Sequence, residues 1–381
     1  MTTPILAIPA LSLRGVASTP RDDAPALDVS FEARRRVITA VLGEPGSGKT
    51  ATLRAIAGLD LLEGGAVTVE GADVTARAPH LRGLGYVPRG FGLASDLTVG
   101  ETIRFGLRAA RRSSMEREIR LAELVHLLDL ADRGDELTGR LAVLERMRLS
   151  IARALCAEPV LLLLDDPLAA LRGRQRDVGR RTLRAFLERL RISVLLTTTD
   201  PDDAAALAES TAVMEAGRVT QTGPTSEVLA RPGTVSTAVL AGYDVLLEGR
   251  VEAGLVRESH VGAAAVPPRV ASGSSVHLLA HPSGLRAVPT GHGLGLGVTG
   301  TVLHCRPMGP MWLTEVALGQ RATLLARWEW DSEPPAVGDQ VELAANTVRI
   351  YVEGQLLDDE QAQPPAVEPV ERPAVRISNA G

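Results

Sequence analysis

The sequence has 381 residues, which is long for one ordinary domain and predicts two, each large enough to bury its own core. Hydrophobic residues make up 45% of it but aromatic residues only 3%, so aliphatic side chains must build these cores. The net charge is -5 and basic residues are spread along the whole chain, which argues against direct binding of nucleic acid.

Several features favour a cytoplasmic chain. Residues 1–10 lack a basic start and contain Pro4 and Pro9, so they do not fit a signal peptide. Cys156 and Cys305 lie outside any CxxC spacing, which favours a reducing compartment over a zinc site or a disulfide framework. No stretch approaches the roughly 18 apolar residues that cross a bilayer. Any role at a membrane therefore needs a partner.

From Ile5 to about Gly242, short apolar runs alternate with stretches of helical period. The clearest runs are Val37 to Leu42, Val160 to Leu164 and Val194 to Thr198, and a clear helical stretch is Glu118 to Leu130. Buried parallel strands joined by crossover helices give this pattern. Residues 1–242 are therefore expected to form an α/β domain.

After Gly242 the sequence changes to short β-rich pieces broken by glycine and proline, so residues 243–353 are expected to form a small all-β domain. A weak repeat supports this, because each half offers a G-x-V segment and later a G-x-x-V-x-L segment. The segments are Gly249 to Val251 with Gly273 to Leu278, and Gly300 to Val302 with Gly338 to Leu343. Chance recurrence of glycine-led strands is the alternative. Prolines and acidic residues leave little to bury in residues 354–381, which are predicted to be disordered.

The strand Val37 to Leu42 runs directly into a G-x-x-x-x-G-K-[ST] segment, which is followed by the helix-compatible run Ala51 to Ala57. This order of strand, loop and helix predicts a phosphate-binding loop. Its glycines let successive backbone N–H groups and the helix N-terminus face phosphates, Lys49 supplies a mobile charge, and the Thr50 hydroxyl is a ligand for Mg²⁺. The candidate nucleotide-binding residues are Gly43, Glu44, Pro45, Gly46, Ser47, Gly48, Lys49, Thr50 and Ala51.

Lys49 is the only lysine in the sequence, and every other cationic side chain apart from histidine is arginine. A compact ammonium fits a phosphate cradle, whereas a planar guanidinium does not. The retention of this one lysine predicts that ATP binding is still in use.

The apolar run Val160 to Leu164 ends in Asp165 and Asp166, which places two carboxylates at the C-terminal end of a buried strand. Ligand sites of parallel sheets lie at that edge. We expect Asp165 to hold Mg²⁺ through water and Asp166, the candidate catalytic residue, to orient a nucleophilic water. A solvated strand end is the simpler explanation of an isolated Asp-Asp pair, but the phosphate loop upstream favours the functional one.

Taken together, these residues resemble the ABC ATPase family, particularly subunits of importers for molybdate, polyamines, iron or sugars. The resemblance covers about residues 5 to 353. It also depends on Leu53 to Leu59, Leu84 to Pro88, Leu97 to Val99, Ile151 to Leu155, Leu162 to Leu171 and Val213 to Arg218. It implies an α/β P-loop NTPase with a RecA-like core and a helical subdomain, followed by a small all-β, OB-like domain of the type called TOBE.

The resemblance also implies ATP and Mg²⁺ as cofactors. The implied partners are transmembrane permease subunits, a second ATP-binding subunit in a homodimer or a heterodimer and, indirectly, an extracytoplasmic solute-binding protein. The chain would then lie in the cytoplasm, on the inner face of the membrane.

Several positions depart from the family pattern. Arg89 stands where the family has a glutamine that senses Mg²⁺ and the γ-phosphate, and Leu141 to Glu145 aligns with the Leu-Ser-Gly-Gly-Gln signature. A shifted alignment on Leu137 to Gly139 is the alternative, although the spacing to the downstream Arg-Ala segment argues against it. The remaining departures are Asp166 for the catalytic glutamate, Thr199 for the switch histidine, Arg172 for an aspartate, and the lack of an adenine-stacking aromatic around Ala17 to Pro20.

Two functions remain open at this point. One is an importer subunit that couples ATP hydrolysis to transport, and the other is a pseudo-ATPase that binds ATP and regulates or scaffolds a transporter. A further hypothesis gives the C-terminal domain an oxyanion site at Ser283, Arg286 and the glycines of Gly291 to Gly297, with a packing and dimerisation module as the simpler alternative. His292 and His304 stand without a second ligand at metal spacing, so we expect neither to bind a metal.

Overall fold

The computed structural model describes residues 8–20, 25–108, 113–127, 133–259, 261–291, 296–308, 311–320, 322–328 and 333–357. The chain divides into two compact units, Met1–Arg231 and Pro232–Gly381. This division falls before Gly242, where the sequence changes to short β-rich pieces. The reason is that α8 (Val235–Leu240) belongs to the second unit, where its Ala238 packs with Leu279 and Tyr351.

The first unit is built on a sheet with ten strands among the described residues, in the order β5-β4-β1-β2-β10-β9-β3-β8-β7-β6. The strands are β1 (Leu11–Ser18), β2 (Leu27–Ala33), β3 (Ile38–Leu42), β4 (Gly64–Val69), β5 (Ala72–Asp73), β6 (Leu84–Val87), β7 (Leu161–Asp165), β8 (Ser193–Thr198), β9 (Ser210–Glu215) and β10 (Arg218–Pro224). Strands β9, β3, β8, β7 and β6 run parallel, and β1, β2, β4 and β5 form an antiparallel extension. The parallel core confirms the predicted α/β class.

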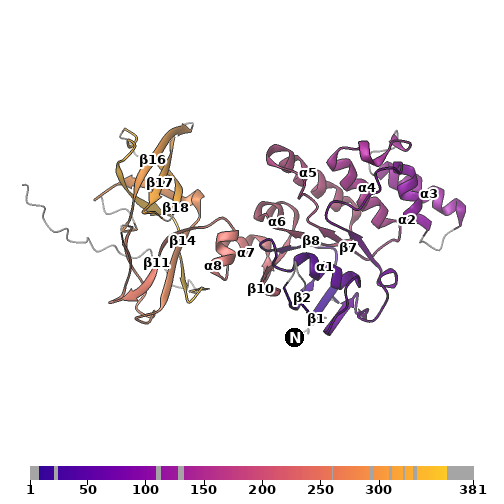
Figure 1. Ribbon diagram of the computed structural model, residues 1–381, viewed down its shortest axis with the longest axis horizontal. Coiled ribbons are helices and arrows are strands. Elements are labelled where there is room, and N and C mark those ends of the chain that lie inside the picture. The colour runs from indigo at the N-terminus through magenta and orange to yellow at the C-terminus, as the bar shows by residue number, and fades with distance from the viewer. Residues whose placement is uncertain are drawn as a thin grey trace, which may run out of the picture. The chain divides into compact units, whose positions relative to one another are not determined.

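Helices complete this unit. They are α1 (Lys49–Ala57), α2 (Val99–Arg108), α3 (Ser114–Leu127), α4 (Val143–Leu155), α5 (Gly173–Leu190), α6 (Pro201–Leu207) and α7 (Thr225–Ala230). Helices α2, α3 and α4 lie together at one end of the unit, and α2 contacts both of the others (Figure 1). This group is the predicted helical subdomain.

The predicted helix Glu118 to Leu130 is α3. It begins earlier than expected because Ser113 and Glu116 cap each other's backbone N–H groups, at 3.3 and 2.7 Å. Residues 128–130 lie outside the described residues.

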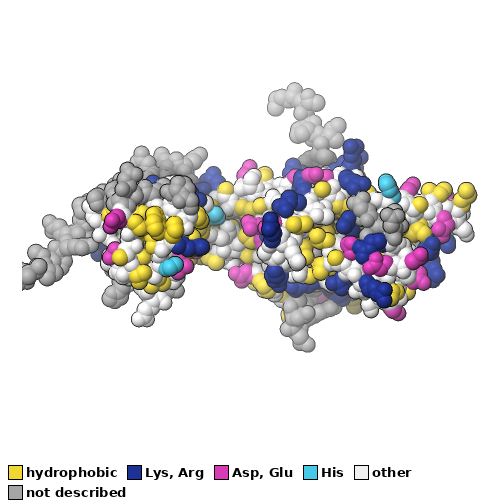
Figure 2. Space-filling view, turned by 90° about the horizontal axis from the view of Figure 1, so that it is seen from above, with side chains coloured by type: hydrophobic (Ala, Val, Ile, Leu, Met, Phe, Trp, Pro, Cys, Tyr) yellow, Lys and Arg dark blue, Asp and Glu magenta, His cyan; other side chains and the backbone are white. Residues whose placement is uncertain are grey.

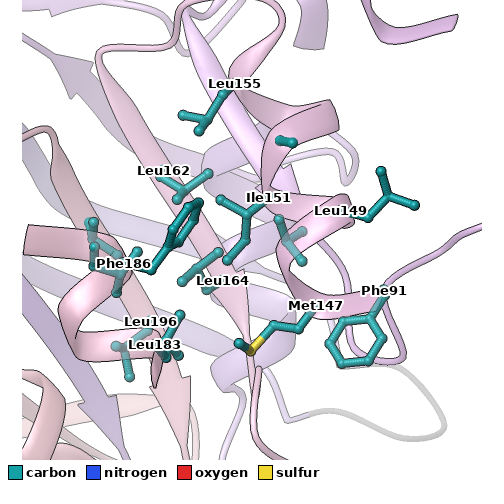
Figure 3. Close-up of a cluster of buried hydrophobic side chains, with 14 of the residues drawn as sticks. Phe91, Met147, Leu149, Ile151, Leu155, Leu162, Leu164, Leu183, Phe186 and Leu196 are labelled. Carbon is teal, nitrogen blue, oxygen red and sulfur yellow. The ribbon is translucent and has the colours of Figure 1, made fainter. Parts of the chain in front are cut away.

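The apolar strands of the core are buried on both faces. Leu162 and Leu164 of β7 face a cluster that includes Ile151 of α4 and Phe186 of α5, as Figure 3 shows. The alternate residues of β7, Leu161 and Leu163, pack instead with α1 and the antiparallel strands. Because neither face meets water, the strand is a continuous apolar run without polar alternation.

In the part of the second unit that the structure describes, all elements are strands apart from α8 and a short 3-10 turn at Pro282–Gly284. Its strands are β11 (Asp244–Glu252), β12 (Leu255–Glu258), β13 (Gly262–Ala265), β14 (Ser275–Ala280), β15 (Leu285–Pro289), β16 (Val298–Met308), β17 (Met311–Leu318), β18 (Ala322–Trp328), β19 (Gln340–Ala345), β20 (Arg349–Val352) and β21 (Gln355–Leu356). Five strands close a ring in the order β15-β18-β17-β16-β19 and back to β15. The predicted small β domain is therefore a closed barrel with an attached set of strands.

The repeat found in the sequence is also a repeat of strand pairing. In the first copy β11 pairs with β14, with Gly249 opposite Val276, and in the second β16 pairs with β19, with Gly300 opposite Val341. Each copy also has a backbone hydrogen bond of 2.8 Å from the N–H of the later glycine, Gly273 or Gly338, to a valine carbonyl. The shared register confirms the repeat and argues against chance recurrence.

The start of the predicted disordered tail is ordered. Gln355–Leu356 form β21, which pairs with β20, and the Leu356 N–H donates to the Gly233 carbonyl at 2.9 Å. The prediction of disorder is therefore wrong for residues 354–357, because the pairing of a two-residue strand leaves little trace in composition. Residues 358–381 lie outside the described residues.

Charge of both signs is mixed on the face drawn in Figure 2. Figure 2 shows arginine side chains interspersed with acidic ones on the visible face. Within the described ranges, no helix combines the length and the apolar character needed to span a bilayer.

Candidate functional site

The predicted phosphate loop lies between the end of β3 at Leu42 and the start of α1 at Lys49. Gly48 has a φ of 104°, and a Cβ there would also press on Leu27 and Met214 at 3.1 Å. Helix α1 has no side-chain cap and no acidic residue in its first turn. Its free N–H groups and the positive end of its dipole therefore face the loop, an arrangement that binds anions.

Lys49 is held inside this loop. Its side chain is buried, and Nζ donates to the carbonyls of Gly43 and Glu44 at 2.8 and 2.6 Å and to Ser47 Oγ at 3.2 Å. Burial lowers the pKa of Lys49 to about 8, although Asp166 and Asp165 favour its charged form. An anionic ligand would favour the ammonium and raise this pKa again.

Three of the predicted residues shape the loop and do not line the cavity described below. A Cβ on Gly43 would collide with the Met214 carbonyl oxygen, and the Gly217 N–H donates to the Ser47 carbonyl at 2.9 Å. Glu44 contributes the carbonyl that accepts from Lys49. The loop is thus fitted against the turn between β9 and β10, a contact that the sequence did not indicate.

Asp165 ends β7 beside the phosphate loop. The hydroxyl of Thr50 donates to Asp165 Oδ1 at 3.0 Å, and the hydroxyl of Thr197, at the end of β8, donates to the same oxygen at 2.9 Å. The structure thus brings the two predicted Mg²⁺ ligands into direct contact. Thr197 was missed by the sequence prediction, although its place at the C-terminal end of a strand was a usable signal.

Asp166 is buried in a strained position. Its φ is 46°, its N–H donates to Thr197 Oγ1 at 2.9 Å, and its Oδ2 lies 3.6 Å from Arg89 Nη2. Its other oxygen, Oδ1, is buried without a hydrogen-bond partner among the described residues. Burial raises the pKa of Asp166, while the charge of Arg89 lowers it.

These groups surround a cavity of about 630 Å³, a volume suited to a nucleotide-sized ligand. Its lining residues are Pro45, Gly46, Gly48, Lys49, Thr50, Ala51, Arg54, Asp60, Arg89, Asp165, Asp166, Thr197 and Thr199. Arg54 holds one side through two hydrogen bonds to Asp60, of 2.9 and 2.8 Å. The loop and the carboxylates predicted from distant segments thus converge on one space.

The residues that the sequence predicted to depart from the family pattern lie in different surroundings. Arg89 and Thr199 line the cavity. Arg172 instead precedes α5 and donates to the Ala169 carbonyl at 2.6 Å. Val143 and Leu144, at the start of α4, pack on the apolar core as partly buried residues.

Near the expected adenine position, a small hollow of about 20 Å³ lies beside α1. Its lining residues are Ser18, Thr19, Pro25, Leu27, Ala51, Ala55, Asp60 and Leu61, none of which is aromatic. Residues 21–24 lie outside the described ranges.

The oxyanion hypothesis for the second unit stays a prediction. Ser283 Oγ pairs with His281 Nδ1 at 2.7 Å, and Arg286 lies exposed on β15. Residues 292–295, which include His292, lie outside the described residues. His304 is exposed on β16 opposite Glu315. Over the described ranges, no three His, Cys, Asp or Glu side chains gather as a metal site.

Comparisons with known proteins agree with this geometry. A family model described as ABC transporter matches residues 26–169. The sulfate/thiosulfate import ATP-binding protein CysA of Bradyrhizobium diazoefficiens is 33% identical over 331 residues, 86% of this chain and 95% of that protein. The Fe(3+) ions import ATP-binding protein FbpC of Streptomyces coelicolor is 35% identical over 302 residues, 77% of this chain and 86% of that protein.

Among solved structures, the ADP conformation of MJ1267, an ATP-binding cassette of an ABC transporter, matches with a TM-score of 0.51 at 20% identity. The match covers 59% of this chain and 96% of that one, and it supports the fold alone. With a phosphate loop, paired strand-end carboxylates and relatives similar over nearly their whole length, the chain belongs to the family of ABC transporter ATP-binding proteins.

Proposed function

We propose that this chain is the ATP-binding subunit of an importer and couples nucleotide binding to solute transport by partner membrane subunits. The observation that carries the proposal is the uncapped N-terminus of α1 with the buried Lys49, both lining the cavity of about 630 Å³. Backbone N–H groups, one ammonium and one hydroxyl are the groups that P-loop proteins use to hold a triphosphate.

The proposed Mg²⁺ site fits the residues present. Thr50 Oγ1 and Asp165 Oδ1 are hard oxygen donors only 3.0 Å apart, and Mg²⁺ prefers such ligands together with phosphate oxygens and water. When bound, the ion would neutralise charge on the β- and γ-phosphates. Asp166 would orient water beside it, but its side chain is one methylene shorter than the glutamate of the family, and a displacement of about 1 Å lowers rates on the order of 100-fold.

The proposed partners follow from the relatives. The relatives from Bradyrhizobium diazoefficiens and Streptomyces coelicolor are named as ATP-binding proteins for import of sulfate or thiosulfate and of Fe(3+) ions, respectively. We infer that this chain also acts through transmembrane permease subunits on the inner face of the membrane, and indirectly with an extracytoplasmic solute-binding protein. The solute would then be selected by those partners and not by the ATP-binding cavity.

A second candidate function is a pseudo-ATPase that binds ATP and regulates or scaffolds a transporter. Arg89 and Thr199 line the cavity at positions where the family has a glutamine and a histidine. In the family, ATP is sandwiched between the phosphate loop of one subunit and the signature of the other. A homodimer of this chain would have two such ATP sites, and Val143 and Leu144 would face the phosphates in each of them. A heterodimer with an intact subunit would keep one complete site.

Binding and hydrolysis of Mg-ATP by the purified chain separate these functions. Isothermal titration and steady-state phosphate release are compared for the unchanged protein, for Lys49→Ala and for the control Arg218→Ala, whose side chain is 72% exposed outside the cavity. Turnover that requires Lys49 selects the hydrolysing importer subunit. Saturable binding that Lys49→Ala abolishes, without turnover in any variant, selects the pseudo-ATPase. Absence of binding to the unchanged chain contradicts both.

A further inference from the structure

Three cationic side chains line the cavity among the described residues, and they differ in how firmly they are held. Lys49 has three acceptors, and Arg54 forms two hydrogen bonds with Asp60. Among the described residues Arg89 has a single polar contact, the 3.6 Å pair with Asp166, and 68% of its side chain is exposed. The guanidinium end of this pair lies largely in water, and 3.6 Å is too long for a strong hydrogen bond, so Arg89 can exchange its partner readily.

The sheet register explains why Arg89 meets Asp166. Strands β6 and β7 are parallel neighbours, and Val87 lies opposite Leu164. Arg89 comes two residues after Val87, and Asp166 comes two residues after Leu164. Both therefore lie at the edge where parallel sheets bind their ligands. A residue far upstream in the sequence is thereby placed beside the candidate catalytic carboxylate.

The backbone that carries Arg89 is anchored although its side chain is exposed. The Phe91 carbonyl accepts from Ser150 Oγ at 2.7 Å and from Arg153 Nη2 at 3.1 Å, and the Gly92 carbonyl accepts from Arg153 Nη1 at 2.6 Å. Both donors belong to α4. The loop is thus held near the cavity while the guanidinium is free to reorient.

Asp166 creates an electrostatic problem that this arginine can solve. Its side chain is only 10% exposed, and Oδ1 has no hydrogen-bond partner among the described residues. A buried carboxylate at the cavity edge repels a phosphate that approaches it. A guanidinium between the two anions interacts favourably with both.

On the basis of the proposed ATP binding, we propose that Arg89 binds the terminal phosphate of ATP and makes the site prefer ATP over ADP. The guanidinium exchanges its single contact with Asp166 for a two-pronged contact with phosphate oxygens, a geometry that arginine provides and glutamine does not. ADP lacks the terminal phosphate, so Arg89 stays with Asp166 when ADP is bound. Arg89 is therefore the specificity-determining residue for the terminal phosphate.

The test compares the affinities of AMP-PNP, a non-hydrolysable ATP analogue, and of ADP by isothermal titration with Mg²⁺. The variants are Arg89→Gln, which has no charge, and Arg89→Lys, which keeps the charge but loses the fork. The matched control is Arg218→Gln, because Arg218 is 72% exposed and forms a comparable ion pair of 3.3 Å with Asp28. Lysine labelled with ¹³C reports occupancy of the site, since Lys49 gives the only lysine signal.

We expect Arg89→Gln to lower the ratio of AMP-PNP to ADP affinity about tenfold, the effect of one charge-assisted hydrogen bond, while ADP affinity changes less than about twofold. The ratio for Arg89→Lys should lie between those of Arg89→Gln and the unchanged protein. The ratio for Arg218→Gln should equal that of the unchanged protein. An unchanged ratio in Arg89→Gln, or an equal loss for both nucleotides, overturns the inference. If the unchanged chain binds neither nucleotide, the proposed function fails first, so the two failures are distinguishable.

Discussion

Helices α1 and α4 begin in opposite ways, although the family pattern assigns a phosphate to both N-termini. Helix α1 follows Gly48, and its third residue, Ala51, presents no acid to the free N–H groups. Helix α4 follows Ala142, and its third residue, Glu145, accepts a hydrogen bond from the Ala142 N–H at 2.8 Å. Arg133 pairs with the same carboxylate.

The difference shows that a helix N-terminus attracts an anion only while its own side chains leave it free. At α4 the carboxylate of Glu145 already occupies the position that complements the helix dipole. A phosphate would have to approach this negative charge and the half-buried Val143 and Leu144. At α1, by contrast, the helix N-terminus is open and lines the cavity.

The largest expected effect comes from giving α1 the acid that α4 carries. Ala51→Glu places a carboxylate at the third helical position, where it caps the free N–H groups and repels phosphate. We expect ATP affinity, measured by isothermal titration, to fall by at least about 100-fold, or roughly 3 kcal/mol. Ala51→Gln has nearly the same size without charge and should lose far less. Equal losses in both variants would mean that size, and not charge, closes the site.

A smaller effect concerns the protonation of Lys49 at the start of α1. The first turn of α4 contains no lysine. Burial lowers the pKa of Lys49 from the ordinary 10.5 to about 8 without nucleotide. Between these two values only the unfolded chain binds the proton, so stability from this group rises as pH increases through that window and is reduced below pH 8. A triphosphate favours the ammonium, so nucleotide should raise this pKa.

The measurement follows the single ¹³C-lysine signal against pH, with and without ATP. A midpoint near 8 that moves upward with ATP is the expected result. Proton uptake on binding at about pH 8.5, from titrations in buffers of different ionisation enthalpy, is an independent check. A midpoint that ATP leaves in place would show that Lys49 does not contact the phosphates.

The smallest effect is expected from Glu145→Gln, which weakens the cap of α4. The change removes the ion pair with Arg133 and the favourable interaction with the helix dipole, while the amide oxygen can still accept from Ala142. The free energy of unfolding should fall by about 0.5–1 kcal/mol in chemical denaturation. The control Glu118→Gln removes an exposed pair with Arg104 at 3.6 Å and should change stability very little. A decrease no larger than in the control would argue against capping by Glu145.

Much of the fold could be predicted from local patterns. The strand Val37 to Leu42, the loop after it and the helix from Ala51 were expected, and the structure has β3, the loop and α1 there. Their pattern depends on neighbours in sequence. The sequence also predicted the repeat in the second unit, because the glycine and valine spacings of β11 and β14 recur in β16 and β19. The strand Gln355–Leu356 was not predicted, since β21 is only two residues long.

The candidate site could be predicted residue by residue but not as a constellation. Thr50, Asp165 and Asp166 were each assigned from their own segments, yet neither Thr197 nor the packing of Gly43 against Met214 was foreseen. Arg89 was noticed only as a departure from a pattern. The cap at Glu145 could have been predicted, because it joins residues only three positions apart.

The sequence by itself determined the phosphate loop, because eight consecutive residues, which join a strand to a helix and include the first two residues of that helix, contain nearly all of its chemistry. Only the tertiary structure decided that Arg89 faces Asp166 and that Asp165 receives the hydroxyls of Thr50 and Thr197. These contacts depend on which strands are neighbours and in what register, and this is set by packing of the whole sheet between its two cores, not by any local segment.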